Sequence, residues 1–486
     1  MNIVWFKRDL RLTDNEAIHN AISSGRKTLL LYILEPSLQN DMHYSKRHFD
    51  FIKQSLQNLQ KALLPYHTQI LIVEEEALTV FEKLNNLVNI HGVFSHQETG
   101  LKITYDRDLQ ISQYFKIHNI KWTESINNGV IRGIKNRKTW KEDWYDYMNK
   151  EVFPFEPTPR SFLKYKDIEV LENHFKLVSL ETKTDSLFQK GGFIMGKRYL
   201  NSFYKERVLE YSKNISKPEK ARKSCSRLSP YIAWGNLSIR EVFQEATRYL
   251  VNKDRKRNLL NFMSRLRWQS HFIQKFEMEF QMEFVAVNKG YRNLNQLVKP
   301  NYHQAWIAGK TGIPIVDACM RCLNETGYLN FRMRALVVSF YTHNLWQPWQ
   351  NCSLHLAQNF LDFEPGIHYP QIQLQAGVTG VNTLRVYNPV KNSIEHDAEA
   401  VFVKKWIPEL SNLPLPFIHE PWKLTAIEQD LYNFRLGENY PKPIVDLEST
   451  RKFSSDILWK LRKDKEVKKD EKRILATLVL PNRDAS

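Results

Sequence analysis

Short apolar runs alternate with amphipathic stretches over the first 125 residues of the chain. The runs, which are typical of strands buried on both faces, stand at residues 3–6, 29–34, 70–73, 93–95 and 120–122. Apolar residues at helical spacing lie between them, near 14–24, 44–64, 76–88 and 103–117. This alternation predicts a doubly wound parallel sheet, with helices on both faces, over residues 1–125.

The pattern changes after residue 125. Residues 126–194 show weak periodicity and several prolines, so we expect a long connection between two domains. From residue 195 strand signals largely vanish, and helical spacing dominates at 238–250, 255–277, 314–324, 332–347 and 352–361. We therefore expect an all-α domain over residues 195–450, followed by a charged tail, 451–486, that is partly mobile or forms one surface helix.

The charge of the chain indicates a partner. Lys and Arg number 70 against 53 Asp and Glu, and the resulting net charge of +17 attracts polyanions such as nucleic acid. The alternative is that Lys-rich stretches such as 463–472 only solubilise the chain. No run of about 18 apolar residues and no basic-then-apolar leader is present, so we expect a cytoplasmic monomer that does not enter a membrane.

Two glycine- or serine-containing segments are candidate phosphate sites. Residues 225–235, CSRLSPYIAWG, place hydroxyl side chains and free backbone amides before a predicted helix, which suits phosphate oxygens, although a turn with capping serines has the same pattern. Residues 309–312, GKTG, are not a P-loop, because that motif needs a glycine where this chain has Gln304. A Gly-x-Gly-x-x-Gly after the first strand is also absent, so a standard dinucleotide site there is unsupported.

The remaining candidates are cysteines and carboxylates. Cys319 and Cys322 lie one helical turn apart, and a metal or iron–sulfur site would need the other two cysteines to join them; we interpret all four as structural thiols and expect no metal. Asp362 and Glu364 flank a phenylalanine, with Arg334 as the natural counter-charge on an earlier helix. An ion pair that only stabilises the domain is the alternative.

Several segments together resemble the photolyase/cryptochrome family. They are residues 3–15, IVWFKRDLRLTDN; 226–235, SRLSPYIAWG; 310–321, KTGIPIVDACMR; 387–389, YNP; and 402–410, FVKKWIPEL. The match is colinear to about residue 450. The resemblance implies a Rossmann-like antenna domain that can carry a second chromophore of unknown identity, and a helical domain that binds FAD at the base of a basic cavity.

The resemblance also implies roles for individual residues. The cofactor-binding residues would be Tyr211, Cys225, Ser226, Arg227, Leu228, Ser229, Phe262, Arg334, Asp362, Glu364 and His368, with Arg334 and Asp362 beside the isoalloxazine and His368 at its N5 edge. The DNA-binding residues would be Arg265, Trp268, Phe331 and Arg332, where Trp268 stacks on a flipped dimer. Trp268, Arg265 and His368 are therefore the candidate catalytic residues, and Trp349 with Trp346 the candidate electron carriers.

The chain departs from the family pattern at positions that matter for repair. Arg265 replaces a glutamate, and Phe331 an asparagine, common in photolyases of the cyclobutane-dimer class; the His pair of (6-4) photolyases is also absent. Ile372 replaces the flavin-proximal tryptophan of the electron-feeding triad, and only Trp349 matches that triad, as its middle member. Photoreduction must then use another route, for which Trp346, Tyr369 and Tyr341 are candidates. His368 replaces an asparagine, and an ionisable ring there could tune the flavin redox state.

Three functions follow as hypotheses. The first is light-driven, FAD-dependent repair of UV-induced pyrimidine lesions, cyclobutane dimers ahead of (6-4) products, in duplex or single-stranded DNA. The second is a blue-light photoreceptor of cryptochrome type without repair, which the altered dimer contacts and the incomplete triad favour. The third is a structural nucleic-acid binder, which the retained flavin-facing residues make the weakest.

Overall fold

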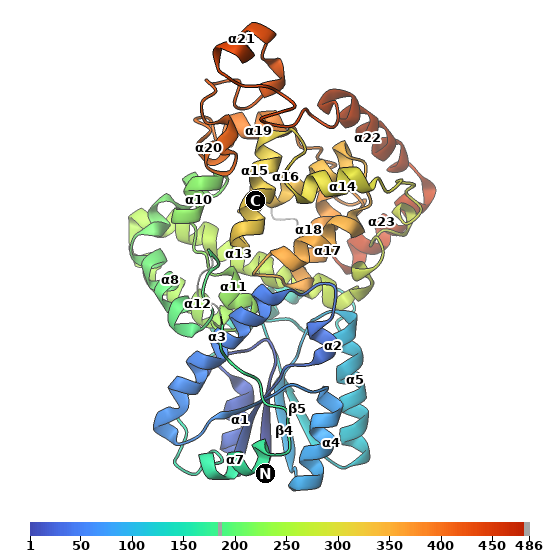
Figure 1. Cartoon of the computed structure of the whole chain (residues 1–486). Coiled ribbons are helices and arrows are strands. Elements are labelled where there is room, and N and C mark those ends of the chain that lie inside the picture. The colour runs from blue at the N-terminus through green and yellow to red at the C-terminus, as the bar shows by residue number, and fades with distance from the viewer. Residues whose placement is uncertain (183–186, 481–486) are drawn as a thin grey trace.

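The first 125 residues form one parallel sheet. The structure, a computed structural model, describes residues 1–182 and 187–480. The strands are β1 (Asn2–Phe6), β2 (Thr28–Ile33), β3 (Ile70–Val73), β4 (Gly92–His96) and β5 (Lys121–Ser125), in the spatial order β3-β2-β1-β4-β5 (Figure 1). Every pairing is parallel, and the order reverses at β1, so the predicted doubly wound sheet is confirmed.

Alternate residues of the central strand face opposite layers of helices, as the pleat of a strand requires. Ile3 and Trp5 pack in the core under α4 (Ala77–Leu87) and α5 (Lys102–Ile117). Val4 and Phe6 pack in the core under α1 (Glu16–Ser23) and α3 (Lys46–Leu63). Both faces of β1 are therefore buried, which explains its unbroken apolar run. The sequence did not predict the single turn α2 (Pro36–Gln39).

The segment after the sheet is more structured than a plain connection. It contains α6 (Trp140–Asn149) and α7 (Tyr165–Glu172). Between them the chain runs beside the start of β2, where the Thr28 amide donates to the Ser161 carbonyl at 2.9 Å and the Leu163 amide to the Thr28 carbonyl at 3.1 Å. The weak periodicity of this segment hid both helices because each is short.

The rest of the chain is helical, as predicted. Its helices up to residue 431 are α8 (Phe193–Lys205), α9 (Tyr211–Asn214), α10 (Pro218–Ser224), α11 (Ser229–Ala233), α12 (Ile239–Arg248), α13 (Lys253–Met278), α14 (Pro300–Ile307), α15 (Pro314–Thr326), α16 (Phe331–Ser339), α17 (Trp349–Asn359), α18 (Pro365–Gln375), α19 (Pro389–His396), α20 (Val401–Trp406) and α21 (Ala426–Leu431). None of the helices in the described part of the chain combines the length and apolar character needed to cross a bilayer.

The carboxyl ends of the strands face the helical domain (Figure 1). The loop after β1 meets the turn after α11, where Gly235 has a φ of +71° and a Cβ atom would collide with the backbone of Arg8. Within the helical domain α18 approaches α13 closely, because a Cβ on Gly366 would lie 2.8 Å from Ile273 Cα. Glycine at these two positions lets the backbones that carry the candidate site pack against each other.

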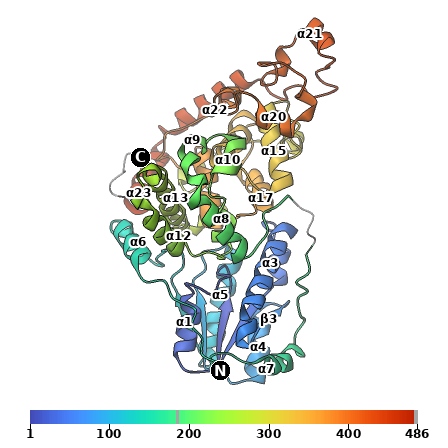
Figure 2. The same ribbon diagram turned by 90° about the vertical axis from the view of Figure 1, so that its left-hand side faces the viewer.

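The C-terminal residues differ from the expectation of a mobile tail or one surface helix. They form two helices, α22 (Leu447–Leu461) and α23 (Lys465–Thr477), which bury Leu458, Val467, Ile474 and Leu478 in the core of the helical domain. Both helices belong to the helical half of the molecule in Figure 2, and an ion pair between Arg473 and Glu279, the residue after α13, joins α23 to it at 2.5 Å. The high charge of the segment hid its apolar stripe, in which only one residue is buried in every one or two helical turns.

Candidate functional site

An ion pair stands at the centre of the candidate site. Arg334, on α16, places its Nη2 atom 3.0 and 2.9 Å from the two carboxylate oxygens of Asp362, in the turn between α17 and α18. The Arg334 Nε atom donates to the Leu329 carbonyl at 2.9 Å, and the guanidinium lies 3.9 Å from the ring centroid of Phe360. Burial raises the pKa of Asp362, but the adjacent guanidinium outweighs it and holds that pKa below its usual value. The pair is thus ionised and fixed in orientation.

The loop at residues 225–229 lies against this pair. Ser229 hydrogen-bonds to the Asp362 carboxylate through its side chain. Arg227 has a left-handed φ of +60°, and its guanidinium lies 3.7 Å from the ring centroid of Tyr328, which precedes α16. Gln189 clamps the loop, because it accepts from the Arg227 guanidinium at 2.7 Å and donates to the Arg227 carbonyl at 2.9 Å. The predicted phosphate loop and the predicted ion pair therefore come together.

Two further guanidinium groups surround the same place. Arg207 donates to the Ser226 carbonyl at 3.2 Å, and Arg222 lies 3.5 Å from the Tyr328 carbonyl oxygen. Burial lowers the pKa of Arg227, and the positive charge of Arg222 lowers it further. Burial likewise lowers the pKa of Arg207, and the positive charge of Arg227 lowers it further. Excess buried positive charge is the environment that an anion with two phosphates neutralises.

Sequence reasoning missed Arg207 and Arg222. Both lie in short elements with several neighbouring Lys and Arg residues, and no spacing distinguishes a buried arginine from a solvated one there. Cys225, which precedes the loop, is a buried thiol whose pKa burial raises to about 12, so it is neutral and not a nucleophile.

One face of α13 carries three of the predicted residues at successive turns. Phe262 is buried and packs edge-on to Tyr211 of α9, with ring centroids 6.0 Å apart. The positive charge of Arg265 opposes the rise that burial causes in the pKa of the Tyr211 hydroxyl. Trp268, one turn further on, packs on His271 and Phe272 but remains 36% exposed. The face thus passes from buried to exposed along α13.

Phe331 and Arg332 lie at the start of α16. The Phe331 side chain is 52% exposed, which is unusual for a large aromatic ring. Arg332 lies 3.4 Å from the Tyr387 hydroxyl.

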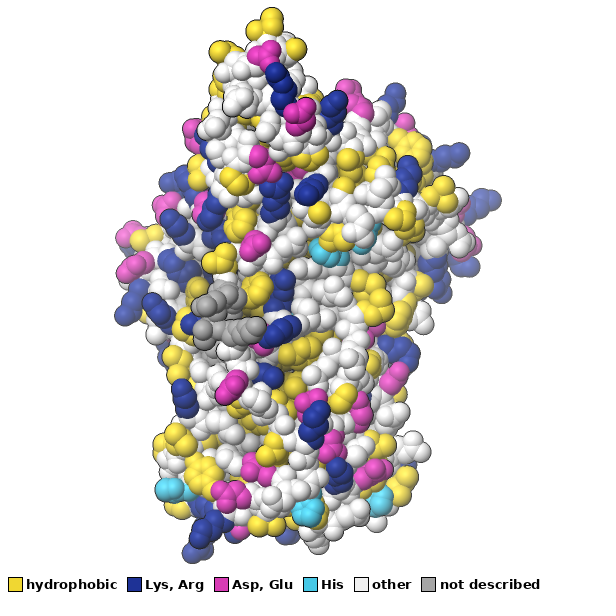
Figure 3. Space-filling view, in the orientation of Figure 1, with side chains coloured by type: hydrophobic (Ala, Val, Ile, Leu, Met, Phe, Trp, Pro, Cys, Tyr) yellow, Lys and Arg dark blue, Asp and Glu magenta, His cyan; other side chains and the backbone are white. Residues whose placement is uncertain are grey.

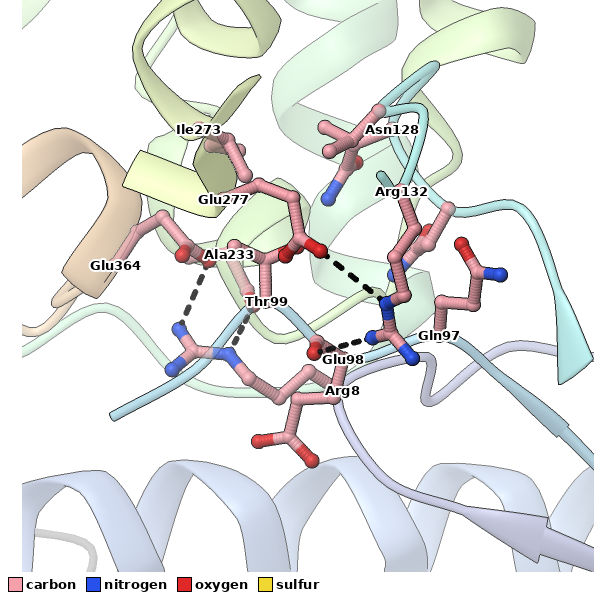
Figure 4. A pocket seen from close by; sticks show the side chains of 12 residues that line it. Arg8, Gln97, Glu98, Thr99, Asn128, Arg132, Ala233, Ile273, Glu277 and Glu364 are labelled. Carbon is pink, nitrogen blue, oxygen red and sulfur yellow. Dashed lines mark hydrogen bonds and ion pairs between the residues drawn. The ribbon is translucent and has the colours of Figure 1, made fainter. Parts of the chain in front are cut away.

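Glu364 contacts the sheet domain. Its carboxylate accepts from the Gly366 amide at 3.3 Å, which caps α18, and lies 3.3 Å from Nη2 of Arg8, in the loop after β1. Arg8 also donates to the Ala233 carbonyl at 3.1 Å (Figure 4). Burial raises the pKa of Glu364, and Arg8 opposes that rise. The cavity beside them encloses about 20 Å³, room for about one water molecule, and its charged lining residues are Arg8, Glu98, Arg132, Glu277 and Glu364.

His368 is neutral in this environment. Its Nε2 atom lies 2.9 Å from the Ser353 carbonyl oxygen, to which it donates, and burial lowers its pKa to about 3. The expectation that this ring could tune a flavin by changing its charge therefore has no support near neutral pH. The proton on Nε2 leaves Nδ1 as an acceptor.

Comparison with known proteins decides the family. Residues 262–460 match the FAD binding domain of DNA photolyase, and residues 2–145 match the DNA photolyase domain. The chain belongs to the DNA photolyase and cryptochrome family. The relatives of this photolyase-family chain include cryptochrome DASH of Synechocystis, 26% identical with 91% of this chain and 95% of the relative covered, and deoxyribodipyrimidine photo-lyase of Vibrio cholerae, 26% identical with 92% and 98% covered.

The fold agrees with solved members of the family. The crystal structure of a Synechocystis cryptochrome superposes with a TM-score of 0.85 at 24% identity, covering 94% of this chain and 99% of that one. An archaeal photolyase from Sulfolobus tokodaii, solved with two FAD molecules, gives a TM-score of 0.77 at 24% identity, covering 95% and 100%. Repair enzymes and cryptochromes both occur among the relatives of this photolyase-family chain.

The predicted electron carriers, Trp349 and Trp346, lie close to each other. Trp349 is buried, with its ring centroid 6.3 Å from that of Tyr369, and Trp346 and Trp349 line one crevice. Ile372, one turn after Tyr369 on α18, is also buried. The Tyr369 ring thus lies next to Trp349, although Ile372 stands where the family resemblance implies a tryptophan close to the flavin.

The cysteines do not gather. All four are buried free thiols, and among the described residues no group of three His, Cys, Asp or Glu side chains is arranged to hold a metal ion. The Cys322 sulfur instead lies 3.3 Å from the guanidinium of Arg222, one of the arginines beside the loop at residues 225–229.

Proposed function

We propose that this chain binds FAD and catalyses light-driven repair of UV-induced pyrimidine lesions in DNA, with cyclobutane dimers preferred to (6-4) products. FAD, bound and photoexcited in its reduced form, supplies the electron that opens the lesion. The match of residues 262–460 to the FAD-binding domain supports the cofactor. The partly buried guanidinium cluster supports it independently, because Asp362 is paired within it and a diphosphate would neutralise the remaining charge.

The residues of the chain would divide the work of holding the cofactor. Arg207, Arg222 and Arg227, with the hydroxyls and amides of Ser226, Leu228 and Ser229, would bind the phosphates. Tyr211 and Phe262 would pack against the cofactor from α9 and α13. The Arg334–Asp362 pair would fix the isoalloxazine, and His368 would offer its Nδ1 acceptor beside it.

The observation that carries the repair hypothesis is the exposure of two aromatic rings on α13 and α16, the helices that also carry candidate cofactor-binding residues. Trp268 and Phe331 leave a third to a half of their surfaces open, while Arg265 and Arg332 stand beside them on the same helices. A flipped base stacks on exposed aromatic rings, and neighbouring cations bind the phosphates that flank it. Figure 3 shows Lys and Arg side chains over much of the helical half on the face it displays, as phosphate binding requires.

An antenna chromophore in the sheet domain remains an expectation. A photolyase of Sulfolobus tokodaii was solved with two FAD molecules, taken to imply a novel light-harvesting cofactor in that protein, which supports a second chromophore in general. The carboxyl edge of the sheet, where ligands of such sheets bind, is here covered by the helical domain and leaves about 20 Å³. A chromophore at that edge would require the Arg8 and Glu364 region to open.

A repair assay tests the proposal. Flavin-loaded, chemically reduced protein is incubated with oligonucleotides that carry either lesion, as duplex and as single strand, in blue light and in the dark. We expect light-dependent restoration of the cyclobutane dimer, and none by an Asp362→Asn variant that has lost its flavin. Flavin binding without repair of either lesion would contradict the proposal.

The second candidate is a blue-light photoreceptor, which two observations favour. The Arg265 guanidinium acts on Tyr211, where it opposes the rise that burial causes in the pKa of the hydroxyl, and the Phe331 side chain can offer no hydrogen bond to a base. A receptor would bind flavin and respond to light without restoring either lesion. A structural DNA binder would be colourless, so the visible absorbance of the purified protein separates that third hypothesis from both. We further propose that the protein acts as a monomer in the cytoplasm.

A further inference from the structure

A tyrosine, a histidine and an aspartate form a chain of hydrogen bonds between the two domains. The Tyr369 hydroxyl, on α18, lies 2.5 Å from Nε2 of His43, in the loop between α2 and α3. Nδ1 of His43 lies 2.7 Å from an Asp41 carboxylate oxygen, which also accepts from the His43 backbone amide at 2.9 Å. The Tyr369 side chain is 1% exposed and His43 is also buried, whereas Asp41 is partly exposed. The hydrogen bond between the tyrosine and the histidine is therefore held away from bulk water, and the chain reaches the surface at Asp41.

The chemistry of the groups fixes the direction of each hydrogen bond. Burial raises the pKa of Asp41, but its hydrogen bonds with His43 outweigh burial and leave that pKa below its usual value, so the carboxylate only accepts. His43 Nδ1 must then carry the proton, which makes Nε2 the acceptor for the Tyr369 O–H. Burial raises the pKa of Tyr369, so this group is a phenol that donates to the histidine in the resting protein.

The tyrosine ring contacts both the candidate flavin-facing residue and the retained tryptophan. Its ring centroid is 5.4 Å from that of His368 and 6.3 Å from that of Trp349. Phe276 of α13 stacks on its other side at 6.0 Å, with an angle of 13° between the planes. Tyr369 therefore occupies the gap that Ile372, one turn away, leaves in an aromatic path.

We propose that Tyr369 is the residue that donates an electron to photoexcited oxidised flavin in this protein, and that His43 accepts the phenolic proton in the same step. The proposal rests on FAD binding beside the Arg334–Asp362 pair, as proposed above. Tyr369 loses one electron to the flavin and its O–H proton moves to His43 Nε2, so a neutral phenoxyl radical and an imidazolium result. Asp41 is a positioning residue that holds the histidine tautomer and stabilises the imidazolium.

The cycle closes with an external reductant. A solution thiol gives one electron to the radical through Trp349, and the proton returns from His43 to the phenolate oxygen, while the oxidised thiol is released. Each cycle thus moves one electron from thiol to flavin and leaves the protein unchanged. A phenol without a proton acceptor would be a poor donor, because its oxidised form would keep a proton that it binds very weakly. The pair with His43 is the feature that makes Tyr369, and not an isolated tyrosine, suited to this role.

Flash photolysis of the flavin-loaded, oxidised protein tests the proposal. We expect the wild type to form a transient neutral tyrosyl radical, detected by its visible absorption and by electron paramagnetic resonance, and we expect its formation to slow in deuterated water. Tyr369→Phe should abolish that signal and lower the yield of photoreduced flavin by at least tenfold. His43→Phe and Asp41→Asn retain the phenol, and each should lower the yield and remove the deuterium effect.

The matched control is Tyr341→Phe. Tyr341 is also buried and hydrogen-bonds to a histidine, His303, at 2.8 Å, but it packs on Trp306 and not on His368. The Tyr341→Phe variant should give the same yield of photoreduced flavin as the wild type. Wild-type photoreduction by Tyr369→Phe, or a tryptophanyl radical as the first species in the wild type, would overturn the proposal. Chemically reduced Tyr369→Phe should repair lesions like the reduced wild type, so a failure of the repair hypothesis would appear there and not in photoreduction.

Discussion

Arg8 and Glu364 form a buried ion pair that joins the first loop of the sheet domain to the first turn of α18. The guanidinium also reaches the Phe363 carbonyl at 2.5 Å and stacks 4.5 Å above the Trp234 ring. One side chain thus binds two segments of the helical domain, residues 233–234 and residues 363–364, and the loop that carries it lies in the stretch whose sequence first indicated the family.

Removal of that arginine should destabilise the folded protein. Arg8→Ala leaves the Glu364 carboxylate buried without its partner, and breaking a buried pair in this way costs about 3 kcal/mol. Urea unfolding at neutral pH would measure the loss in the free energy of unfolding. The double variant Arg8→Ala/Glu364→Gln should recover part of it, because no buried charge remains. Equal loss in the single and double variants would show that packing, not charge, dominates.

The Arg334–Asp362 pair should control cofactor content. Asp362→Asn keeps the shape of the side chain but leaves Arg334 without its counter-charge, so we expect flavin affinity to fall by about tenfold or more, equivalent to about 1.4 kcal/mol. Flavin absorbance per protein after purification and after titration with FAD measures this. The control is Glu409→Gln. It removes a carboxylate that lies 2.7 Å from the guanidinium of a different arginine, Arg321, and this variant should retain flavin.

Trp268 should contribute to lesion binding without contributing to the cofactor site. Its 36% exposure leaves the ring available for stacking, and the loss of one such stack costs about 1–3 kcal/mol. Trp268→Ala should therefore weaken binding to lesion-containing DNA by about tenfold or more while flavin content stays constant. Trp459→Ala on α22, at a ring with 46% exposure, is the matched control. Flavin loss in Trp268→Ala would instead assign the ring to the structural core.

A buried lysine gives the protein a pH-dependent stability term. Burial lowers the pKa of Lys275 on α13 from 10.5 to about 8, and the neighbouring Arg137 lowers it further. Below pH 8 the lysine is charged in both folded and unfolded states, so the full destabilisation is present. Between pH 8 and 10.5 the unfolded state binds more protons, and the destabilisation is relieved as pH rises.

Lys275→Met should therefore stabilise the protein most at neutral pH. We expect a gain of about 1–3 kcal/mol at pH 7 that shrinks between pH 8 and 10.5. Denaturant unfolding of both proteins across this pH range measures the difference. Lys213→Met, at an exposed lysine that pairs with Glu210, should show no such trend. A gain that stays constant with pH would mean that the lysine is not the titrating group.

The sheet domain could be predicted well because its strands are buried on both faces. Each strand is a continuous apolar run, and the amphipathic stretches between them have the helical period, so element order and type follow from the sequence. The C-terminal segment was harder to predict. In α22 and α23 the buried residues are separated by long charged side chains, and the pattern resembles a solvated tail until the packing partners are known.

The candidate site was predictable only through motifs. Arg334 and Asp362 lie 28 positions apart, and no local pattern shows that a turn after α17 brings them together. Arg207 and Arg222 were missed for the same reason. Tyr369 was one of several candidate electron donors, and its pairing with His43 depends on a contact across 326 positions, which periodicity cannot reveal.

The close approach at Gly235 bears on how the molecule can be dissected. The backbone there touches that of Arg8, so each domain covers part of the surface of the other. If the two domains were expressed separately, the Arg8 guanidinium would lose its hydrogen-bond acceptors and the Trp234 ring would be exposed to water. Separately expressed halves should therefore be poorly soluble, and studies of the candidate site call for the intact polypeptide.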